Sequence, residues 1–394
     1  MVLENKFPPD IRVTKEVRSL IEANHVVHLL SMRRTEDKKY EKINGLHVHR
    51  LVPFTKNIFS PSKIINFLSN IPHLKISWYK SMNDLIRKQN IKVVHIHDLP
   101  LVKTGIAAAR NNGIKIIADL HENYPAAVDT MNFNLPMKII NYLSFWKRHE
   151  RRILNNCDRI VVVVPEAKER LFKLGIEKNK IYVVSNTEDV SMFTSNKIDQ
   201  QLASKYKNDF VVSYIGGFGS HRGIDTAIKS IPKLKNEIPN IRLLLVGETP
   251  RDKKFRKISN DLKVNNYVDF IGWQNANLVP SYIELSSICL VPHHKNPHTN
   301  STIPHKLFQY MLLKKPVIVS DCKPLKRVVN ELKSGIVFKS GSADSLADAI
   351  RAIYNTPDSY GENGYSGVIR KYNWQHDGSV LQNIYSEIEN NTKN

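Results

Sequence analysis

The sequence has few cysteines and no long apolar run. Its three cysteines, Cys157, Cys289 and Cys322, are far apart and form no C-x-x-C pair. This usage argues against a disulfide framework or a zinc site and fits a reducing cytoplasm. The longest apolar runs, such as IVVVV at 160–164, fall well short of the roughly 20 residues that cross a membrane. The opening MVLENKFPPD has no apolar stretch of the signal-peptide type.

Acidic residues are scarce relative to basic ones. The 394 residues include 58 Lys and Arg against 37 Asp and Glu, a net charge of +21, and residues 51–118 carry 10 basic and 2 acidic side chains. Nucleic acid, an anionic membrane or a phosphorylated substrate would each account for this charge, and so would a lysine-rich solvated surface. The basic residues are dispersed without a recognised nucleic-acid-binding motif, so we predict no nucleic-acid partner.

Metal-binding patterns are also missing. No two aspartates lie two residues apart, so there is no D-x-D motif to hold a divalent ion on a diphosphate. The histidine pairs, such as His95 and His97, have no partners at usable ligand spacing. We therefore predict no metal and no cofactor, and we interpret His95 and His97 as core residues of an apolar strand.

Short apolar runs alternate with helix-length segments along the whole chain. Such continuous runs are typical of parallel sheets covered on both faces. The predicted strands are 25–30, 47–52, 92–97, 114–119, 159–164, 210–215, 241–246, 267–271, 287–291, 316–320 and 335–338. The polar segment 185–209 separates the two series and is the expected linker. The pattern predicts two doubly wound α/β domains with ligand sites beyond the carboxyl ends of their strands, facing a cleft.

A glycine-rich turn follows the predicted strand 210–215. Its sequence, GGFGSHRG at 216–223, precedes a helical pattern. Glycine lets the backbone approach an anion closely, and the next helix offers free N–H groups. The motif is neither G-x-G-x-x-G, because Arg222 stands at the third glycine position, nor a P-loop. A tight turn without a ligand is the alternative, but the Arg222 guanidinium suits phosphate oxygens.

A second candidate site is the start of the helix in NSTIPHKLFQYM (300–311). Pro304 suits the first helical position, and Lys306 and Gln309 share one face. A polar helix start suits an anion at its tip and a hydroxylated ring one turn further in. An ordinary surface helix is the alternative.

These motifs resemble glycosyltransferase family 4, whose members have the GT-B fold. The resemblance covers nearly the whole chain, in order. It includes ENKFPPDIRVTKEVRSLIEANHVVHLL near the start, IIADLHENYP (116–125), YIGGFGSHRGID, the segment PHKLFQYM followed by KPVIVSD, and GVIRKYNW (367–374). It implies an acceptor-binding domain at 1–190, a nucleotide-sugar-binding domain at 206–375, and a final helix at 376–394 that packs back on the first domain.

The resemblance also implies roles for individual residues. His121 would lie near the donor sugar and the reaction centre. Arg222 and Lys306 would bind the diphosphate, and Gln309, in place of the second glutamate of the family's E-x7-E motif, would bind the ribose. The substrate-binding set is Gly216, Gly217, Arg222, Ser301, His305, Lys306 and Gln309.

The chain departs from the family pattern at several of these positions. Ser301 stands where the first glutamate of the motif would fall. Gly217 stands where many members carry an arginine, a loss of charge that His221 or His305 would compensate. Pro8 and Pro9 replace glycines of the acceptor loop, so acceptor recognition would differ. Without the resemblance, His121 would be interpreted as a core residue.

The resemblance thus implies a retaining glycosyltransferase of the hexosyltransferase type, active in polysaccharide biosynthesis. The donor would be a nucleoside-diphosphate sugar and the acceptor a glycan or lipid-linked glycan. A GT-B epimerase or phosphorylase and a basic nucleic-acid-binding protein are the alternatives. We expect a cytoplasmic protein. The mixed apolar and basic segment 135–154 indicates either a peripheral site on the anionic inner face of the membrane or an ordinary packed helix.

Overall fold

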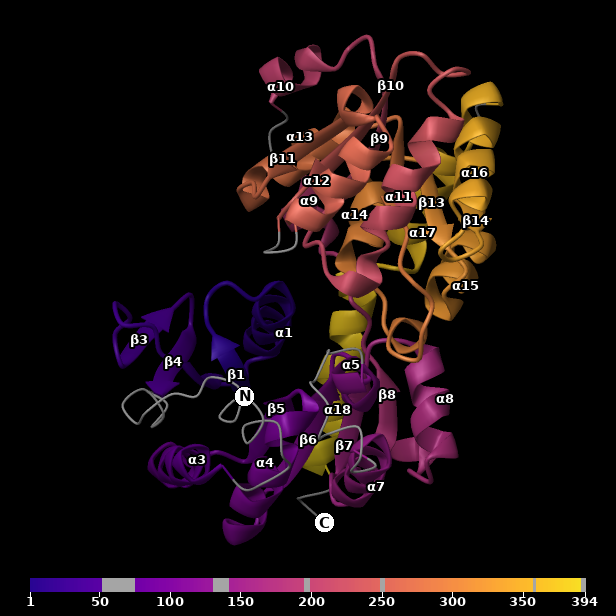
Figure 1. Cartoon of the computed structure of the whole chain (residues 1–394). Helices are drawn as coiled ribbons and strands as arrows, with labels where there is room; N and C mark the ends of the chain where they lie inside the picture. Colours follow the sequence, from indigo (N-terminus) through magenta and orange to yellow (C-terminus); the bar gives the residue numbers. More distant parts are fainter. Residues whose placement is uncertain (52–74, 130–141, 195–198, 249–251, 357–358, 391–394) are drawn as a thin grey trace. The chain divides into compact units, whose positions relative to one another are not determined.

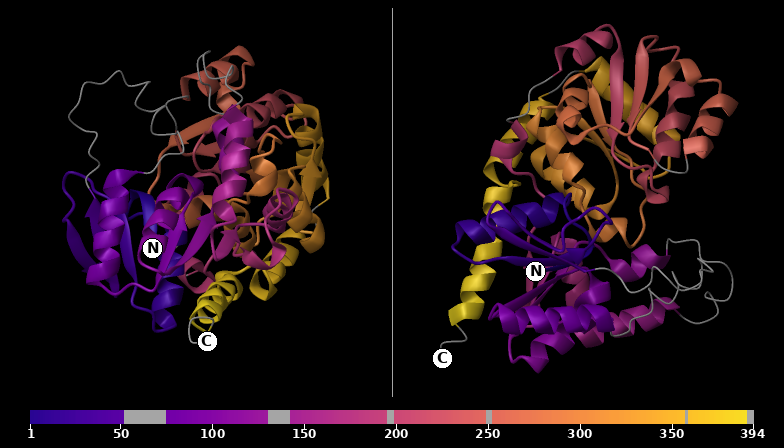
Figure 2. Two further views of the ribbon diagram at one scale, coloured as in Figure 1. Left: turned by 90° about the horizontal axis from the view of Figure 1, so that it is seen from below. Right: turned by 90° about the vertical axis from the view of Figure 1, so that its left-hand side faces the viewer.

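A computed structural model gives the fold. It describes residues 1–51, 75–129, 142–194, 199–248, 252–356 and 359–390. The chain divides into two compact units, Met1–Ser185 with Asp377–Asn394 (unit 1) and Asn186–His376 (unit 2). Each unit is a sheet with helices on its faces (Figure 1). Helix α18 (Trp374–Asn390) begins in unit 2 and continues into unit 1 (Figure 2).

Unit 1 contains a sheet in the order β3-β4-β2-β1-β5-β6-β7-β8. Its strands are β1 (Val2–Lys6), β2 (His28–Met32), β3 (Tyr40–Ile43), β4 (Leu46–Leu51), β5 (Val93–His97), β6 (Lys115–Leu120), β7 (Arg159–Val162) and β8 (Ile181–Val183). Its helices are α1 (Ile11–Glu22), α3 (Ile76–Lys88), α4 (Leu99–Asn111), α5 (Tyr124–Asp129), α7 (Tyr142–Leu154) and α8 (Pro165–Lys173). The chain order reverses between β1 and β5, which is where ligands bind in doubly wound sheets.

Unit 2 contains a parallel sheet in the order β11-β10-β9-β12-β13-β14. Its strands are β9 (Phe210–Ile215), β10 (Ile241–Val246), β11 (Val268–Gly272), β12 (Ile288–Val291), β13 (Val317–Ser320) and β14 (Gly335–Phe338). Its helices are α9 (Val190–Thr194), α10 (Gln200–Lys205), α11 (Ile224–Ser230), α12 (Asp252–Asp261), α13 (Val279–Glu284), α14 (His305–Leu312), α15 (Lys323–Leu332), α16 (Ala343–Asn355) and α17 (Tyr360–Arg370). The reversal of chain order lies between β9 and β12.

The predicted α/β class with two doubly wound sheets is confirmed. Each predicted run overlaps a strand, and the runs 210–215, 241–246 and 335–338 have the observed bounds. One strand departs from the parallel pattern, because β3 pairs antiparallel with β4 at the sheet edge. The sequence YEKI of β3 alternates exposed and half-buried residues, so it lacks the apolar run that marks the other strands.

Two other segments differ from expectation or lie outside the description. The segment 185–209, predicted as a linker, contains α9 and α10 as part of unit 2. Of the mixed segment 135–154, residues 135–141 lie outside the described residues, and the remainder forms α7. Within the described ranges, no helix has the length and apolar character needed to cross a membrane.

Candidate functional site

In unit 2, two loops meet where the strand order reverses. Residues 216–223 follow β9, and residues 292–304 follow β12, the neighbour of β9 in the sheet. Both loops leave the carboxyl ends of parallel strands, so they lie at the same edge, beside the start of α14. The topology therefore brings the predicted residues Gly216, Arg222 and Lys306 to one place.

Lys306 extends from the first turn of α14 over β9. Its Nζ lies 3.7 Å from the centroid of the Tyr214 ring. A Cβ added to Gly216, where φ is +129°, would come within 2.5 Å of that Nζ, so glycine makes room for the ammonium. Burial first, and then the Arg222 charge, hold the pKa of Lys306 well below its usual range. Such a desolvated cation gains stability from a bound anion.

The start of α14 differs in one respect from the prediction. Pro304 has an extended backbone (φ −83°, ψ 144°) and is the N-cap, so His305 and not Pro304 begins the helix. As a proline, the N-cap residue makes no side-chain hydrogen bond to the first turn. Leu307, Phe308 and Met311 are fully buried as expected, which anchors the helix and directs its polar face outward.

Arg222 belongs to a cluster of cationic and imidazole groups. It donates a hydrogen bond from Nη1 to His293 Nε2 over 3.0 Å. Burial, followed by the positive charge of Arg222, lowers the pKa of His221 to about 3 and of His298 to about 4. The imidazoles are therefore neutral at pH 7, and His293 accepts from the guanidinium. The sequence patterns did not predict a role for His293 and His298. Both residues lie in the loop after the apolar strand β12, and that position could have indicated them.

The polar face of α14 carries a further group that the sequence did not suggest. Gln309 donates a hydrogen bond from Nε2 to Glu188 Oε2 over 3.0 Å, and His305 Nδ1 lies 4.0 Å from the same oxygen. Glu188 is buried at 6% exposure. The amide nitrogen of Gln309 is thus engaged, which orients its carbonyl oxygen as an acceptor for another donor. Glu188 lies in the segment expected to be a linker.

Two residues of the predicted substrate-binding set, Ser301 and Gly217, have surroundings that do not indicate ligand binding. The Ser301 hydroxyl donates to the Pro297 carbonyl over 3.0 Å, and the residue is buried. Ser301 therefore stabilises the loop after β12. Among the described residues, no atom lies within 4 Å of a Cβ added at Gly217, so the glycine is not required there by close packing.

In unit 1, His121 follows β6 and lies among carboxylates. Its Nε2 is 3.3 Å from Asp119 Oδ2, and its Nδ1 is 3.7 Å from Asp98 Oδ2. Burial alone lowers the pKa of His121, but the charges of Asp98 and Asp119 outweigh it and raise that pKa to about 9. His121 is therefore an imidazolium at neutral pH, a hydrogen-bond donor rather than a base.

Asp98 has a strained backbone at the end of β5. Its φ is +64° with ψ 147°, a region that residues other than glycine rarely adopt. Its carboxylate makes no capping hydrogen bond to α4. Its carboxylate instead lies near His121. The residue with the strained backbone therefore makes a polar contact at the carboxyl edge of the sheet.

Helix α1 contributes a buried ion pair beneath His121. Arg12 Nη2 lies 3.0 Å from Asp119 Oδ1, and Arg12 Nε lies 2.9 Å from Glu16 Oε1. Each of the three residues is at most 4% exposed. Burial and the neighbouring Asp119 raise the pKa of Glu16 well above its usual range. We did not predict these residues. Arg12 and Glu16 could have been recognised from the sequence, because they are two charged residues on the apolar face of an amphipathic helix.

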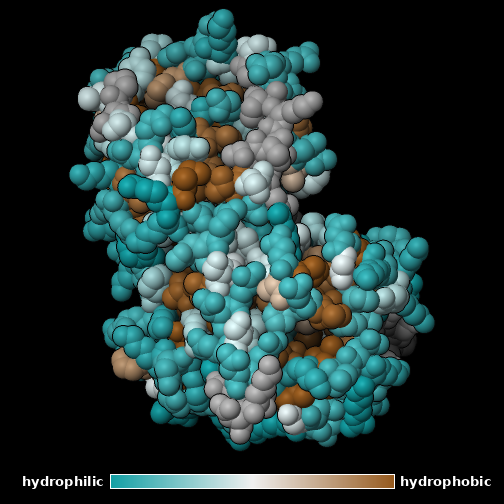
Figure 3. All heavy atoms as spheres, turned by 180° about the vertical axis from the view of Figure 1, so that it is seen from behind, coloured by the Kyte–Doolittle hydropathy of each residue, from teal (hydrophilic) through white to brown (hydrophobic). Residues whose placement is uncertain are grey.

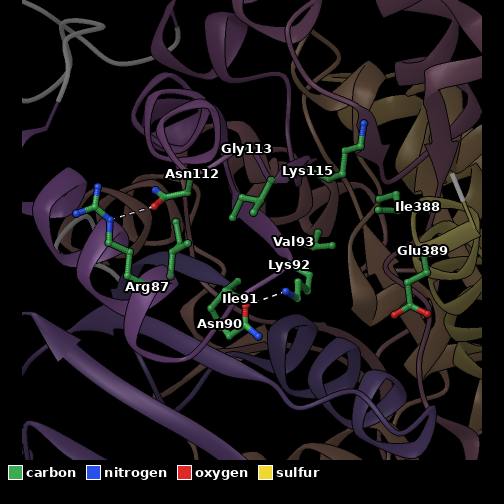
Figure 4. A pocket seen from close by; sticks show the side chains of 12 residues that line it. Arg87, Asn90, Ile91, Lys92, Val93, Asn112, Gly113, Lys115, Ile388 and Glu389 are labelled. Carbon is green, nitrogen blue, oxygen red and sulfur yellow. Dashed lines mark hydrogen bonds between the residues drawn. The ribbon is translucent and has the colours of Figure 1, made fainter. Parts of the chain in front are cut away.

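A separate hollow lies at the opposite edge of the unit 1 sheet. It is lined by Arg87, Lys92, Lys115 and Glu389, among others, near the amino ends of β5 and β6 (Figure 4). Its polar groups are engaged locally, as in the hydrogen bond from Arg87 to Asn112. Because ligands of doubly wound sheets bind at carboxyl ends, we do not assign the reaction to this hollow.

Metal-ligand spacing is absent around the loops of unit 2. Among the described residues of that unit, no three His, Cys, Asp or Glu side chains lie close enough together to hold one ion. Positive charge near the loops comes instead from Arg222 and Lys306.

The two halves of the chain match two related families. Residues 11–191 match the family described as Glycosyltransferase Family 4, and residues 195–367 match the family described as Glycosyl transferases group 1. The chain belongs to glycosyltransferase family 4. The matches bracket all the predicted site residues, from His121 to Gln309.

Curated relatives of this glycosyltransferase are distant. An uncharacterized glycosyltransferase of Methanocaldococcus jannaschii is 21% identical over 64% of each chain. Alpha-monoglucosyldiacylglycerol synthase of Acholeplasma laidlawii is also 21% identical over 64% of each chain. The putative glycosyltransferase EpsD of Bacillus subtilis is 20% identical over 71% of this chain and 72% of the relative. The chain thus aligns with less than two thirds of the length of the first two relatives.

Solved structures show the GT-B fold of the glycosyltransferase. Sucrose-phosphate synthase from Thermosynechococcus elongatus superposes with a TM-score of 0.78 at 18% identity, covering 96% of this chain and 92% of that one. Anabaena HepE in complex with UDP-glucose superposes with a TM-score of 0.74 at 13% identity, covering 98% of both chains. At these identities the likeness establishes the fold alone.

Proposed function

We propose that the protein transfers a hexose-type sugar from a nucleoside-diphosphate sugar to an acceptor hydroxyl, with retention of anomeric configuration. The observation that carries the proposal is the placement of Lys306 and Arg222 at the reversal of strand order in unit 2. The acceptor would be a glycan or a lipid-linked glycan. UDP-glucose is the first donor to test, because HepE has been solved with it.

The leaving diphosphate gains negative charge as the bond to the sugar breaks. Lys306, Arg222 and the N-terminal N–H groups of α14 supply positive potential at this edge of the sheet. These groups are in place before the reaction and need little reorganisation, which makes them effective in the transition state. We propose that they act without a metal ion on the diphosphate.

The binding test is a thermal-shift panel of UDP-, GDP- and ADP-sugars, repeated with and without Mg²⁺. A ligand that binds only the native state raises its stability by RT ln(1 + [L]/Kd). We expect one nucleotide class to raise Tm equally with and without the ion, and product analysis then identifies retention. If no nucleotide sugar raises Tm, the donor assignment is wrong. A shift that needs Mg²⁺ would contradict the metal-free site.

We propose that Gln309 and Glu188 together bind the ribose. The amide of Gln309 is held by Glu188 Oε2 at 3.0 Å, so its carbonyl oxygen and the Glu188 carboxylate would accept from the two vicinal hydroxyls. We expect Gln309→Ala to raise KM about 2- to 13-fold, the effect of one lost hydrogen bond, with a smaller change in kcat. Steady-state rates at several donor concentrations measure this.

The pair also predicts the effect of restoring the family's glutamate. Gln309→Glu alone would place a second carboxylate next to Glu188, and the repulsion should weaken donor binding. The double variant Gln309→Glu with Glu188→Gln exchanges the two groups and should recover affinity. If Gln309→Glu binds the donor as well as the original protein and Gln309→Ala is also unaffected, the helix does not bind the ribose.

We propose that His121 donates a hydrogen bond to the donor sugar near the reaction centre. His121→Ala should lower kcat/KM by about 10- to 150-fold, the range for a hydrogen bond to a charged group. His25→Ala is a matched control in unit 1, because the His25 imidazole pairs with the exposed carboxylate of Glu389. Initial rates of both variants measure the effect. A normal rate for His121→Ala would show that His121 does not contact the donor sugar.

We propose a peripheral location on the inner face of the membrane, in the cytoplasm. Exposed Lys88 and Lys92 belong to the basic segment 51–118, and much of the face in Figure 3 is hydrophilic. Cosedimentation should be stronger with vesicles that contain phosphatidylglycerol than with neutral ones, and salt should reverse it. Lys88→Ala and Lys92→Ala should each weaken binding about fivefold, since one basic residue contributes about 1 kcal/mol. Equal binding to neutral vesicles would contradict this location.

A further inference from the structure

Four ligand-type side chains converge in the interior of unit 1. Glu16 comes from α1, His95 and His97 from β5, and Asp119 from the neighbouring strand β6. Each is at most 1% exposed. One potential ligand atom from each residue lies within 4.8 Å of all the others. The described residues thus include a buried set of two imidazoles and two carboxylates.

The separations within this set are close to those of a metal site. Glu16 Oε2 lies 3.9 Å from both His95 Nε2 and His97 Nε2, and Asp119 Oδ2 lies 3.5 Å from His95 Nε2. Zinc-ligand bonds of about 2.1 Å in a tetrahedron put the ligand atoms roughly 3.4 Å apart. These three pairs would need to close by about half an ångström or less, whereas the full set of four atoms spans up to 4.8 Å, so side-chain rotation must bring the remaining pairs together around one ion.

Within the part of the chain that the structure describes, three of the four side chains present a central atom without a hydrogen bond, whereas Asp119 Oδ2 is shared with Arg12 and His121. Among the described residues, Glu16 Oε2, His95 Nε2 and His97 Nε2 have no hydrogen-bond partner of normal geometry. By contrast, His95 Nδ1 lies 2.9 Å from the Tyr385 hydroxyl, and His97 Nδ1 lies 3.4 Å from the acceptor Asp119 Oδ2. Metal-bound histidines have this arrangement, with one ring nitrogen on the ion and the other held by a neighbour. Buried polar atoms without a partner are costly.

The charge of the cluster also leaves room for a cation. Among the described residues, two cations lie against three carboxylates, which leaves one negative charge without a counterion. The cations are the Arg12 guanidinium and the His121 imidazolium, and the carboxylates are those of Glu16, Asp119 and Asp98. One of the two positive charges comes from Arg12. Its closest contacts are Asp119 Oδ1 at 3.0 Å and Glu16 Oε1 at 2.9 Å, although Asp119 Oδ2 also lies 3.3 Å from Nη2. The guanidinium thus lies on the outer side of both carboxylates, and the other oxygen of each is nearer to the imidazoles.

We propose that Glu16, His95, His97 and Asp119 bind a divalent transition-metal ion of the zinc type inside unit 1. Two imidazoles with two carboxylates are a donor set that suits zinc and its neighbours better than magnesium or calcium, which prefer oxygen alone. Since all four ligands are buried, the ion is structural. It fixes β5, β6 and α1 relative to one another and thereby orients Asp119, which contacts His121.

The test measures metal in the full-length, tag-free protein. After growth with added zinc and dialysis without chelator, we expect about one equivalent of zinc per chain by elemental analysis. Protein prepared with Co²⁺ should show the visible absorption bands of tetrahedral cobalt. Glu16→Gln should lower the metal content at least tenfold, and so should His95→Gln. These readouts do not involve sugar transfer, so they stand or fall apart from the proposed function.

A second histidine group provides the control. His28, His47 and His49 stack on strands β2 and β4 of the same unit, with ring centroids of His28 and His47 4.6 Å apart. His49→Gln should leave the zinc content unchanged. Loss of zinc in His49→Gln but not in Glu16→Gln would place the ion on these strands and overturn the proposal.

Two further outcomes are decisive without any variant. If the original protein contains no stoichiometric metal and its Tm does not change on titration with Zn²⁺ or Co²⁺, the cluster holds a proton instead of an ion. If zinc is present but the cobalt form lacks tetrahedral bands, the proposed ligand set is wrong. The cobalt spectrum is recorded on the original protein, so it tests the proposal even if Glu16→Gln fails to fold.

Discussion

Lys306→Ala is expected to lower kcat and kcat/KM together by about 100- to 1,000-fold, the range for removing one charge-stabilising group. The Lys306 ammonium lies over Tyr214 and Gly216 at the carboxyl end of β9, where the leaving diphosphate is proposed to bind. Its interaction strengthens as the diphosphate gains charge, so its removal costs more in the transition state than in the ground state. Steady-state kinetics with the donor found by the thermal-shift panel measure the loss.

The lowered pKa of Lys306 adds a second readout. Fewer Lys306 side chains are charged in the free protein than an ordinary lysine would allow, and a bound diphosphate restores the charged form. Donor binding should therefore take up a proton and weaken as the pH rises through the lowered pKa. Calorimetry in buffers of different ionisation enthalpy measures this uptake, which Lys306→Ala should abolish.

Lys314→Ala is the matched control for this variant. Lys314 follows the same helix but is exposed and pairs with Glu362 at 3.0 Å. Its removal should leave both kinetics and proton uptake unchanged. Should Lys306→Ala retain normal turnover while remaining folded, the diphosphate does not bind at the start of α14.

Arg222→Ala should lower kcat/KM by about 100-fold or more, because its guanidinium is the other charge proposed to face the diphosphate. Arg222 is held by His293 Nε2 at 3.0 Å, so its planar fork has a defined orientation toward the loop. Arg222→Lys should recover only part of the activity, since an ammonium cannot make two parallel hydrogen bonds to one phosphate. Lys229→Ala, on the exposed side of α11, should behave like the original protein.

The two charges should also be coupled. Arg222 is one cause of the lowered pKa of Lys306, so Arg222→Ala should raise that pKa and reduce the proton uptake on donor binding. The double variant should lose less than the product of the two single effects, as groups that act on one site do. Strictly multiplicative losses with unchanged proton uptake would mean that the residues act at separate places.

The predictable parts of the fold are the strands with continuous apolar runs. Strand β9 has its predicted bounds because FVVSYI is apolar and is ended by two glycines. The edge strand β3 was missed because its side chains meet water on an exposed edge and need no apolar pattern. Strand β8 has only three residues, which is too short for a period to be recognised.

The sequence by itself determined the two doubly wound sheets, the family and the positions of Lys306, Arg222 and His121 at carboxyl ends of strands. These follow from local patterns, since an apolar run ended by glycine or by polar residues marks the end of a strand wherever it packs. Only the tertiary structure decided which distant groups meet. Glu188 reaches Gln309 across 121 residues, and Arg12 reaches Asp119 across 107. Parallel sheets bring such segments together through crossover helices, so the partners are set by the order of strands and the packing of helices, which no local pattern records.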